Sequence, residues 1–315
     1  MSDKPAELLT PDDAGIALAA ALLRAGATVA LPTETVYGLA ARADDATAVA
    51  AIYRAKGRPD FNPLIVHVPG IAAARALAML DEQAEQVAQA FWPGPLTLVL
   101  PLRPGAAIAP AVTAGLPTIA LRCPAHPLMR AVLEESGLPL AAPSANRSGA
   151  VSPTAPAHVA ASLGGRIGAI LDGGACESGV ESTIVALRGD GSWQLLRHGP
   201  VTQDALVALL GQAPAPLADA RIEAPGQLAS HYSPGKKLRL DATTADPDEF
   251  WIGFGPLAGD TSLSASGDLA EAAARLYAAL HLAAAAPQRR VAVAPVPDEG
   301  VGAAINDRLR RAAAD

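Results

Sequence analysis

Residues 56–67, KGRPDFNPLIVH, join an alanine-rich stretch of helical character to a run of β-branched residues. Residues 45–55 favour a helix, and the LIVHV run after Pro63 favours a strand. Only 4 of the 24 basic residues in the chain are lysines, so Lys56 next to Arg58 departs from a marked preference for arginine. The junction is either a solvated turn between a helix and a strand or a site for an anion.

Helical and strand patterns alternate on both sides of this junction. Before it, Thr10 and the following Pro-Asp-Asp predict a helix start with Thr10 as the capping hydroxyl, and Gly26 predicts its end. Further patterns predict helices at 81–91, 126–136 and 155–163 and strands at 95–102, 117–123, 138–145, 167–171, 181–187 and 193–197. Because some neighbouring strands have no helix between them, the sheet is not expected to be all parallel. We expect an α/β fold in which helices pack against a twisted mixed sheet.

A change in composition divides the chain into two domains. Residues 211–235 are rich in proline, alanine and glycine and show no sustained periodicity, which is typical of a linker. The residues after it alternate between strand and helix patterns and are numerous enough for a small core of their own. We predict a large domain over 1–210, a linker over 211–236 and a small Rossmann-like α/β domain over 237–315.

Composition argues against several classes of function. A formal net charge of -7 and a pI near 5.4 argue against a surface that binds nucleic acid strongly as a whole, although a small basic pocket remains compatible. Cys123 and Cys176 lie far apart and form no CxxC motif, which suits a reducing compartment and predicts no metal site. The acidic start lacks the pattern of a signal peptide, and Arg24 interrupts the early apolar segment. We expect a cytoplasmic protein that does not bind membranes.

Polar side chains cluster in the junction and in three further stretches, PTETVYG (32–38), PSANRSGAVSPT (143–154) and GGACESGVESTIV (173–185). The phosphate loop, the dinucleotide fingerprint, the HExxH motif and the nucleophile elbow are all absent from the sequence, so a nucleotide site here must be built differently. Taken singly, each stretch is more typical of an ordinary turn or loop than of a site. His67 in its strand is likewise compatible with a core histidine.

Lys56, Arg58 and Arg122 each have a structural and a functional explanation. Lys56 and Arg58 at the end of a helix are explained by the helix dipole alone. The compact ammonium of lysine and the planar fork of arginine nevertheless suit a polyphosphate. Arg122 lies in a predicted strand, where a buried cation costs several kcal/mol without an anionic partner. That partner is either a protein carboxylate or the carboxylate of a substrate.

Several stretches together resemble the YrdC-like family. These are LPTETVYGLA (31–40), KGRPDFNPLIVHV (56–68), FWPGPLTLVL (91–100), IALRCPAHP (119–127), PLAAPSANRSG (139–149) and GVESTIV (179–185), in the order of the family. SHYSPGK (230–236) and GAAINDRLRRAA (302–313) resemble its long, two-domain members. The resemblance implies a twisted mixed sheet around a concave, positively charged cavity in the first domain.

The resemblance also implies an activity and its partners. Members of this kind are nucleotidyltransferases that make threonylcarbamoyl-AMP and pyrophosphate from L-threonine, bicarbonate and ATP with Mg²⁺. A downstream tRNA threonylcarbamoyl transferase complex then modifies the adenosine beside the anticodon in tRNAs that read ANN codons. Direct binding of nucleic acid is not expected to be strong.

Roles for individual residues follow from the same resemblance. L-threonine would contact Thr35, His67, Arg122, Ala142 and Ser182. ATP would contact Arg58, Asn62, Thr118, Ser144, Asn146, Ser152, Arg197 and, from the linker, Tyr232. Lys56 and Arg58 would be catalytic, because fixed cations stabilise the charge of the triphosphate and of departing pyrophosphate. No residue is predicted to ligate a metal, and the linker is a candidate lid.

Two alternative functions are less well supported by the sequence. A non-catalytic module could hold double-stranded RNA in a positive concavity, but the acidic net charge and the intact serine, threonine and histidine set weigh against it. Carbamoyl transfer in hydrogenase maturation would need an acylphosphatase segment and a cysteine-rich zinc segment, which we do not find in this sequence.

Overall fold

Two β-sheets organise the computed structural model, which describes residues 5–217, 222–227 and 230–314. The strands of the larger sheet are β1 (Glu7–Leu9), β2 (Val29–Leu31), β3 (Gly38–Arg42), β4 (Ile65–His67), β5 (Leu96–Pro101), β6 (Thr118–Arg122), β7 (Leu140–Ala141), β8 (Ala169–Leu171), β9 (Thr183–Leu187) and β10 (Trp193–Arg197). They lie in the order β1-β8-β2-β3-β7-β4-β6-β5-β9-β10. Parallel pairs such as β4 with β6 adjoin antiparallel pairs such as β5 with β6, which confirms the predicted mixed sheet.

Helices and a part of the linker cover the two faces of this sheet. The helices are α1 (Asp13–Arg24), α2 (Ala46–Lys56), α3 (Ile71–Leu77), α4 (Glu82–Phe91), α5 (Pro110–Thr113), α6 (Pro127–Ser136), α7 (Pro156–Leu163) and α8 (Gln203–Leu210). On one face, residues of α2, α4, α7 and α8 form the main core with alternate residues of the strands. On the other, α1 and α6 pack over β2 and β8, while Ala224 of the linker packs over β5, β6 and β9.

The start of α1 corrects the predicted cap. The N-cap is Asp12, whose Oδ1 accepts a hydrogen bond from Gly15 N at 2.9 Å, and Thr10 Oγ1 donates to the same oxygen at 2.9 Å. Because the helix begins at Asp13, only the Asp12 carboxylate lies within reach of the free amide groups of the first turn. Thr10 therefore orients the cap and is not the cap itself.

The end of α2 fixes the geometry of the cationic junction. Gly57 follows Lys56 and adopts φ 63°, a left-handed conformation that costs little without a Cβ. The chain therefore leaves the helix immediately after Lys56. Lys56 is therefore the last residue of the helix. Arg58 lies beyond the helix and lines a cavity beside β4.

The smaller sheet is wholly parallel and lies in the C-terminal part of the chain. Its strands, β11 (Lys237–Arg239), β12 (Glu249–Gly253), β13 (Thr261–Ser262) and β14 (Arg290–Val293), follow the order β11-β14-β12-β13. It carries the helices α9 (Leu269–Ala285) and α10 (Gly302–Ala312). The parallel strands and the helices agree with the expected small α/β fold.

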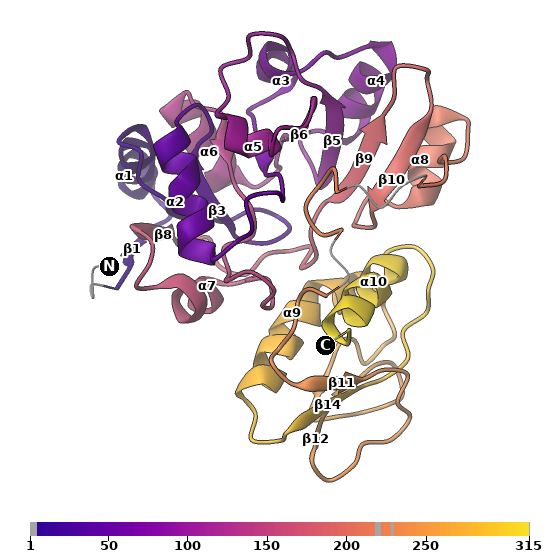
Figure 1. Ribbon diagram of the computed structural model, residues 1–315. Helices are drawn as coiled ribbons and strands as arrows, with labels where there is room; N and C mark the ends of the chain where they lie inside the picture. The colour runs from indigo at the N-terminus through magenta and orange to yellow at the C-terminus, as the bar shows by residue number, and fades with distance from the viewer. Residues whose placement is uncertain (1–4, 218–221, 228–229, 315) are drawn as a thin grey trace.

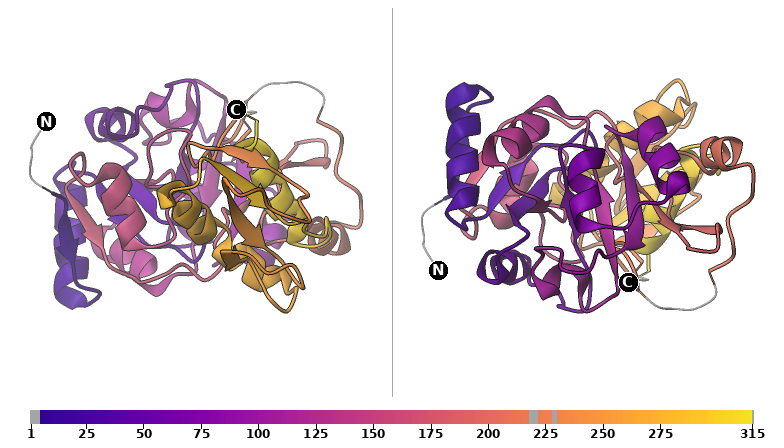
Figure 2. Two further views of the ribbon diagram at one scale, coloured as in Figure 1. Left: turned by 90° about the horizontal axis from the view of Figure 1, so that it is seen from below. Right: turned by 90° about the horizontal axis from the view of Figure 1, so that it is seen from above.

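The two helices α9 and α10 lie between the small sheet and the larger domain (Figures 1 and 2). One hydrophobic cluster contains residues of both helices together with Val36, Val151 and Val180 of the larger domain and Tyr232 of the linker. No helix or strand lies in the described residues between Leu210 and Lys237, while 218–221 and 228–229 of the predicted linker lie outside the described residues. None of the helices in the described part of the chain has the length and hydropathy needed to span a bilayer.

Candidate active site

A cavity opens on the larger sheet where the ends of β4, β6 and β10 meet the linker. Nine of the fourteen residues predicted for the site line it: Thr35, Arg58, His67, Arg122, Ala142, Ser144, Ser182, Arg197 and Tyr232. The register of the sheet explains part of this convergence, because His67 and Arg122 are direct partners in parallel β4 and β6. Partners in adjacent parallel strands point to the same face, so the histidine and the guanidinium project into the cavity together.

Arg122 is held by a protein carboxylate, the first of the two partners that the sequence left open. Its Nη2 lies 2.8 Å from Glu34 Oε1, and the side chains of both residues are almost fully buried. Its Nη1 donates to Thr35 Oγ1 at 2.9 Å, and its Nε donates to the carbonyl of Gly94 at 3.3 Å. Burial acts to raise the pKa of Glu34, but Arg122 outweighs that effect and keeps this pKa below its usual value. The guanidinium is thus fixed in a rigid, charged setting.

Burial also sets the charge of His67. It lowers the pKa of His67 to about 3, and the nearby charge of Arg122 acts in the same direction. The imidazole is therefore neutral near pH 7. His67 can offer a hydrogen bond in the cavity without adding a positive charge.

Lys56 lies behind the cavity wall. Its ammonium donates to the carbonyl oxygens of Ser144 and Asn146, each at 2.6 Å, and only 3% of the residue is exposed. Burial lowers its pKa well below the usual value, and the neighbouring Arg58 lowers it further. A solvated cation at a helix end would not make these contacts. Lys56 connects the end of α2 to the loop that presents Ser144 to the cavity.

Arg58 borders the cavity beside Asn62. The guanidinium donates to the carbonyls of Asn62 and Pro63, at 3.3 and 2.9 Å, and burial lowers the pKa of Arg58 to about 10. In the described chain, the side-chain oxygens of Asn62 and Asn146 are buried without a hydrogen-bond partner. Such orphaned acceptors are costly unless a donor reaches them.

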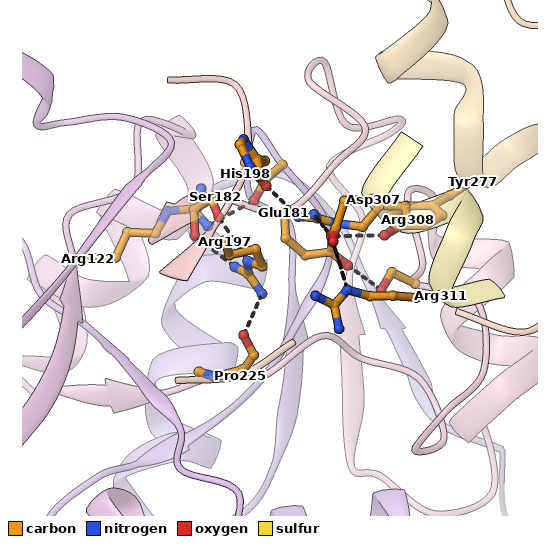
Figure 3. A network of polar contacts seen from close by, with 12 residues as sticks. Arg122, Glu181, Ser182, Arg197, His198, Pro225, Tyr277, Asp307, Arg308 and Arg311 are labelled. Carbon is orange, nitrogen blue, oxygen red and sulfur yellow. Dashed lines mark hydrogen bonds and ion pairs between the residues drawn. The ribbon is translucent and has the colours of Figure 1, made fainter. Parts of the chain in front are cut away.

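Ser182 and Arg197 build the wall beneath the linker (Figure 3). Arg197 donates to the carbonyl and the hydroxyl of Ser182, at 3.0 and 3.1 Å, and to the carbonyl of Pro225 in the linker at 3.4 Å. Ser182 Oγ also lies 2.7 Å from Thr97 Oγ1 of β5. Tyr232 is fully buried above this wall, with φ 67°, and packs edge-to-face on His231.

Five predicted residues do not line the cavity: Lys56, Asn62, Thr118, Asn146 and Ser152. Thr118 begins β6, at the opposite end of the strand from Arg122 and roughly 13 Å along it. Ser152 Oγ donates to Glu181 Oε1 at 2.6 Å. The roles of these five residues toward a substrate stay predictions, as do those of the nine that meet in the cavity.

The sequence assigned no role to two acidic residues of the site, Glu34 and Glu181. Both lie beside assigned residues in the polar stretches, Glu34 before Thr35 and Glu181 before Ser182. That proximity was a usable signal, although their partners lie too far along the chain to be inferred from it. No group of three or more His, Cys, Asp or Glu side chains that could hold a metal ion occurs among the described residues.

Comparison with known proteins places this site in a family. A model of Sua5, YciO and YrdC proteins, described as telomere recombination, matches residues 21–199, and a model described as threonylcarbamoyl-AMP synthase, C-terminal domain, matches residues 201–314. The threonylcarbamoyl-AMP synthases of Bacillus subtilis and Pyrococcus abyssi are 41% and 37% identical to the chain. These alignments cover 97% and 94% of the chain and 94% and 93% of the two relatives.

A solved structure matches both domains together. The crystal structure of P. abyssi Sua5 complexed with L-threonine superposes with a TM-score of 0.87 and 34% identity, over 98% of this chain and 97% of that one. The match therefore extends beyond the larger sheet to the small domain and the linker. The chain belongs to the Sua5/YciO/YrdC family, in the form that carries the additional C-terminal domain.

Proposed function

We propose that the protein is an L-threonylcarbamoyladenylate synthase, a nucleotidyltransferase that converts L-threonine, bicarbonate and ATP into threonylcarbamoyl-AMP and pyrophosphate. The observation that carries this proposal is the cavity, where three arginines and a neutral histidine converge beneath the linker. Two relatives that match nearly the whole chain bear the name of this activity.

L-threonine would occupy the end of the cavity formed by Thr35, His67 and Arg122. A guanidinium carries five N–H groups, and the hydrogen bonds of Arg122 to Thr35 and Gly94 use two of them. Nη2 lies 2.8 Å from Glu34 Oε1 as an ion pair but makes no hydrogen bond, so N–H groups of Arg122 stay available to the substrate carboxylate while Glu34 neutralises part of the charge. Neutral His67, with Ser182, suits the hydroxyl and amino groups of threonine.

The phosphates of ATP would lie toward Arg58 and Arg197, in front of Lys56. An oxygen of threonine carbamate attacks the α-phosphorus, the bond from this phosphorus to the bridging oxygen breaks, and pyrophosphate leaves with that oxygen. Fixed cations stabilise the charge that develops on the leaving group. Mg²⁺ would enter with the phosphates of ATP and neutralise part of their charge, in keeping with a site that offers cations more than carboxylates.

The proposal also includes the formation of the carbamate and the use of the product. The amino group of threonine would form a bond to the carbon of bicarbonate inside the cavity, one C–O bond of bicarbonate would break with release of water, and exclusion of bulk water would then protect the labile carbamate. A tRNA threonylcarbamoyl transferase complex in the cytoplasm would consume the product, and two free cysteines, Cys123 and Cys176, are compatible with that reducing compartment. Binding of double-stranded RNA is disfavoured, because a duplex needs an open basic face and this site is a narrow, covered cavity.

The direct test is a reaction that contains L-threonine, bicarbonate, Mg²⁺ and ATP. We expect threonylcarbamoyl-AMP and pyrophosphate in equal amounts, and neither of them when threonine is omitted. The products are separated by chromatography and identified by mass. Pyrophosphate release that does not depend on threonine, or the absence of any adenylate, would overturn the proposal.

Replacing Tyr232 with alanine tests the predicted lid. The free space in the cavity is about 50 Å³, whereas pockets for small ligands measure roughly 300–1,000 Å³, so this form is too small for ATP, and the proposed lid would open it by moving the linker residues that line it. Tyr232→Ala is expected to lower the yield of threonylcarbamoyl-AMP per ATP consumed by about tenfold, because water reaches the intermediate. Leu217→Ala, at an exposed linker residue, is the matched control. Unchanged kinetics and product retention in Tyr232→Ala would contradict the lid.

A further inference from the structure

Glu181 places a negative charge in a cavity that is otherwise lined by positively charged arginines. Of the lining residues in the described chain it alone bears a carboxylate, whereas Arg58, Arg122 and Arg197 line the same space. A free carboxylate there would repel the phosphates of ATP and would compete with them for the arginines. The cavity can therefore bind ATP tightly only if the charge of this carboxylate is neutralised and its oxygens are directed away from the phosphates.

Two side chains of the small domain hold Glu181 in such a position. Its Oε2 accepts hydrogen bonds from Tyr277 Oη of α9 at 2.7 Å and from Arg308 Nε of α10 at 3.0 Å. Its Oε1 accepts the hydrogen bond from Ser152. Figure 3 shows Arg308 and Tyr277 approaching the carboxylate from the side opposite Arg197. The small domain thus binds one carboxylate oxygen of Glu181, Oε2, and Ser152 of the larger domain binds the other.

Arg308 is itself fixed in place. It has no exposed surface, and it donates to Asp307 Oδ2 at 2.7 Å and to the carbonyl of His198 at 2.9 Å. Its guanidinium also lies 5.5 Å from the ring centre of Tyr232, a geometry typical of a cation–π contact. Arg308 therefore touches the larger domain, the linker and Glu181 at once.

The charge of Glu181 agrees with this geometry. Burial acts to raise its pKa, but Arg308 and, to a smaller extent, Arg197 outweigh burial and lower the pKa to about 2. The group is an anion at neutral pH. Its charge is shared between a cation of the small domain and a cation of the cavity.

We infer that Arg308 and Tyr277 are positioning residues for the nucleotide: they hold Glu181 toward the small domain, so that Arg197 and Arg58 remain available to the phosphates of ATP. The inference rests on the proposed function and gives the small domain a part in it. None of the described residues after Lys236 lines the cavity, so the small domain reaches it through lining residues, of which Glu181 and Tyr232 both contact Arg308.

The test measures equilibrium binding of ATP to the full chain by calorimetry, without threonine, so that no turnover occurs. Arg308→Met removes the charge and keeps most of the volume, and it is expected to raise the Kd for ATP by about tenfold because Glu181 turns to Arg197. The Kd for L-threonine, measured separately, should change by less than about twofold. Arg310→Met is the matched control, since Arg310 lies on the same helix and pairs with Asp298 at the surface.

A second substitution separates positioning from mere support of the fold. Glu181→Gln in the Arg308→Met background removes the competing anion and should return the Kd for ATP to within about threefold of the original. If the double variant binds ATP as weakly as Arg308→Met, the contact is structural and the inference fails. It fails equally if folded Arg308→Met binds ATP normally.

If Arg308→Met does not unfold cooperatively, Tyr277→Phe replaces it, because this change removes one hydrogen bond and should raise the Kd for ATP by about threefold. An unchanged Kd in Tyr277→Phe would overturn the inference. If the unaltered protein binds neither ATP nor threonine, the proposed function fails first, whereas normal binding with no effect of these substitutions refutes only the role of the small domain.

Discussion

Replacing Lys56 with alanine is expected to lower threonine-dependent pyrophosphate release by about 100-fold or more. The ammonium is a buried cation next to Arg58, and the two carbonyls that it holds belong to the loop that presents Ser144 to the cavity. Its loss removes positive charge behind the phosphates and also frees that loop. The rate is measured as pyrophosphate formed under saturating threonine, bicarbonate and ATP.

Arg54→Ala is the matched control for a simple helix-end effect. Arg54 also lies in the last turn of α2 but is exposed, so it contributes to the dipole and not to the site. Lys56→Ala should also lose about 1–3 kcal/mol of unfolding free energy, because the carbonyls of Ser144 and Asn146 lose their donor. A near-normal rate in Lys56→Ala, or an equal loss of rate in Arg54→Ala, would show that Lys56 acts only as a cation at the end of a helix.

Local patterns predicted most of the fold because they act over a few residues. The end of α2 lies within one residue of the predicted one, and so do the bounds of α4 and α6. The elements that were not predicted, β1, β3, α3, α5 and β13, are two to seven residues long. Such segments carry too few residues for a period to emerge, and tertiary contacts decide their conformation.

For the site, most of the assigned side chains in the cavity and many of the partners that hold them come from stretches that resemble the family, but the pairing between them was not predicted. Lys56 reaches Ser144 across 88 positions, and Glu181 reaches Arg308 across 127. No spacing rule connects residues so far apart, because only the packing of α10 against the larger domain brings the second pair together. The sequence therefore predicted which side chains gather in the site better than it predicted what holds them there.

Arg122→Ala is expected to weaken L-threonine binding by about 30-fold or more, since a charge-assisted contact to the substrate carboxylate is lost. It should also lower the free energy of unfolding by about 3–5 kcal/mol, because Glu34 is left buried without its cation. Titration calorimetry with threonine measures the first effect, and denaturant unfolding measures the second.

Pairing this change with Glu34→Gln separates the two roles of Arg122. The double variant no longer buries an unpaired carboxylate, so much of the lost stability should return. Threonine binding should stay weak, because glutamine restores no cation for the substrate. If threonine affinity recovers together with stability, Arg122 is only the structural partner of Glu34. If Arg122→Ala weakens the binding of ATP alone, Arg122 belongs to the ATP-binding part of the cavity. Arg122 serves both roles only if stability and threonine affinity separate in the double variant.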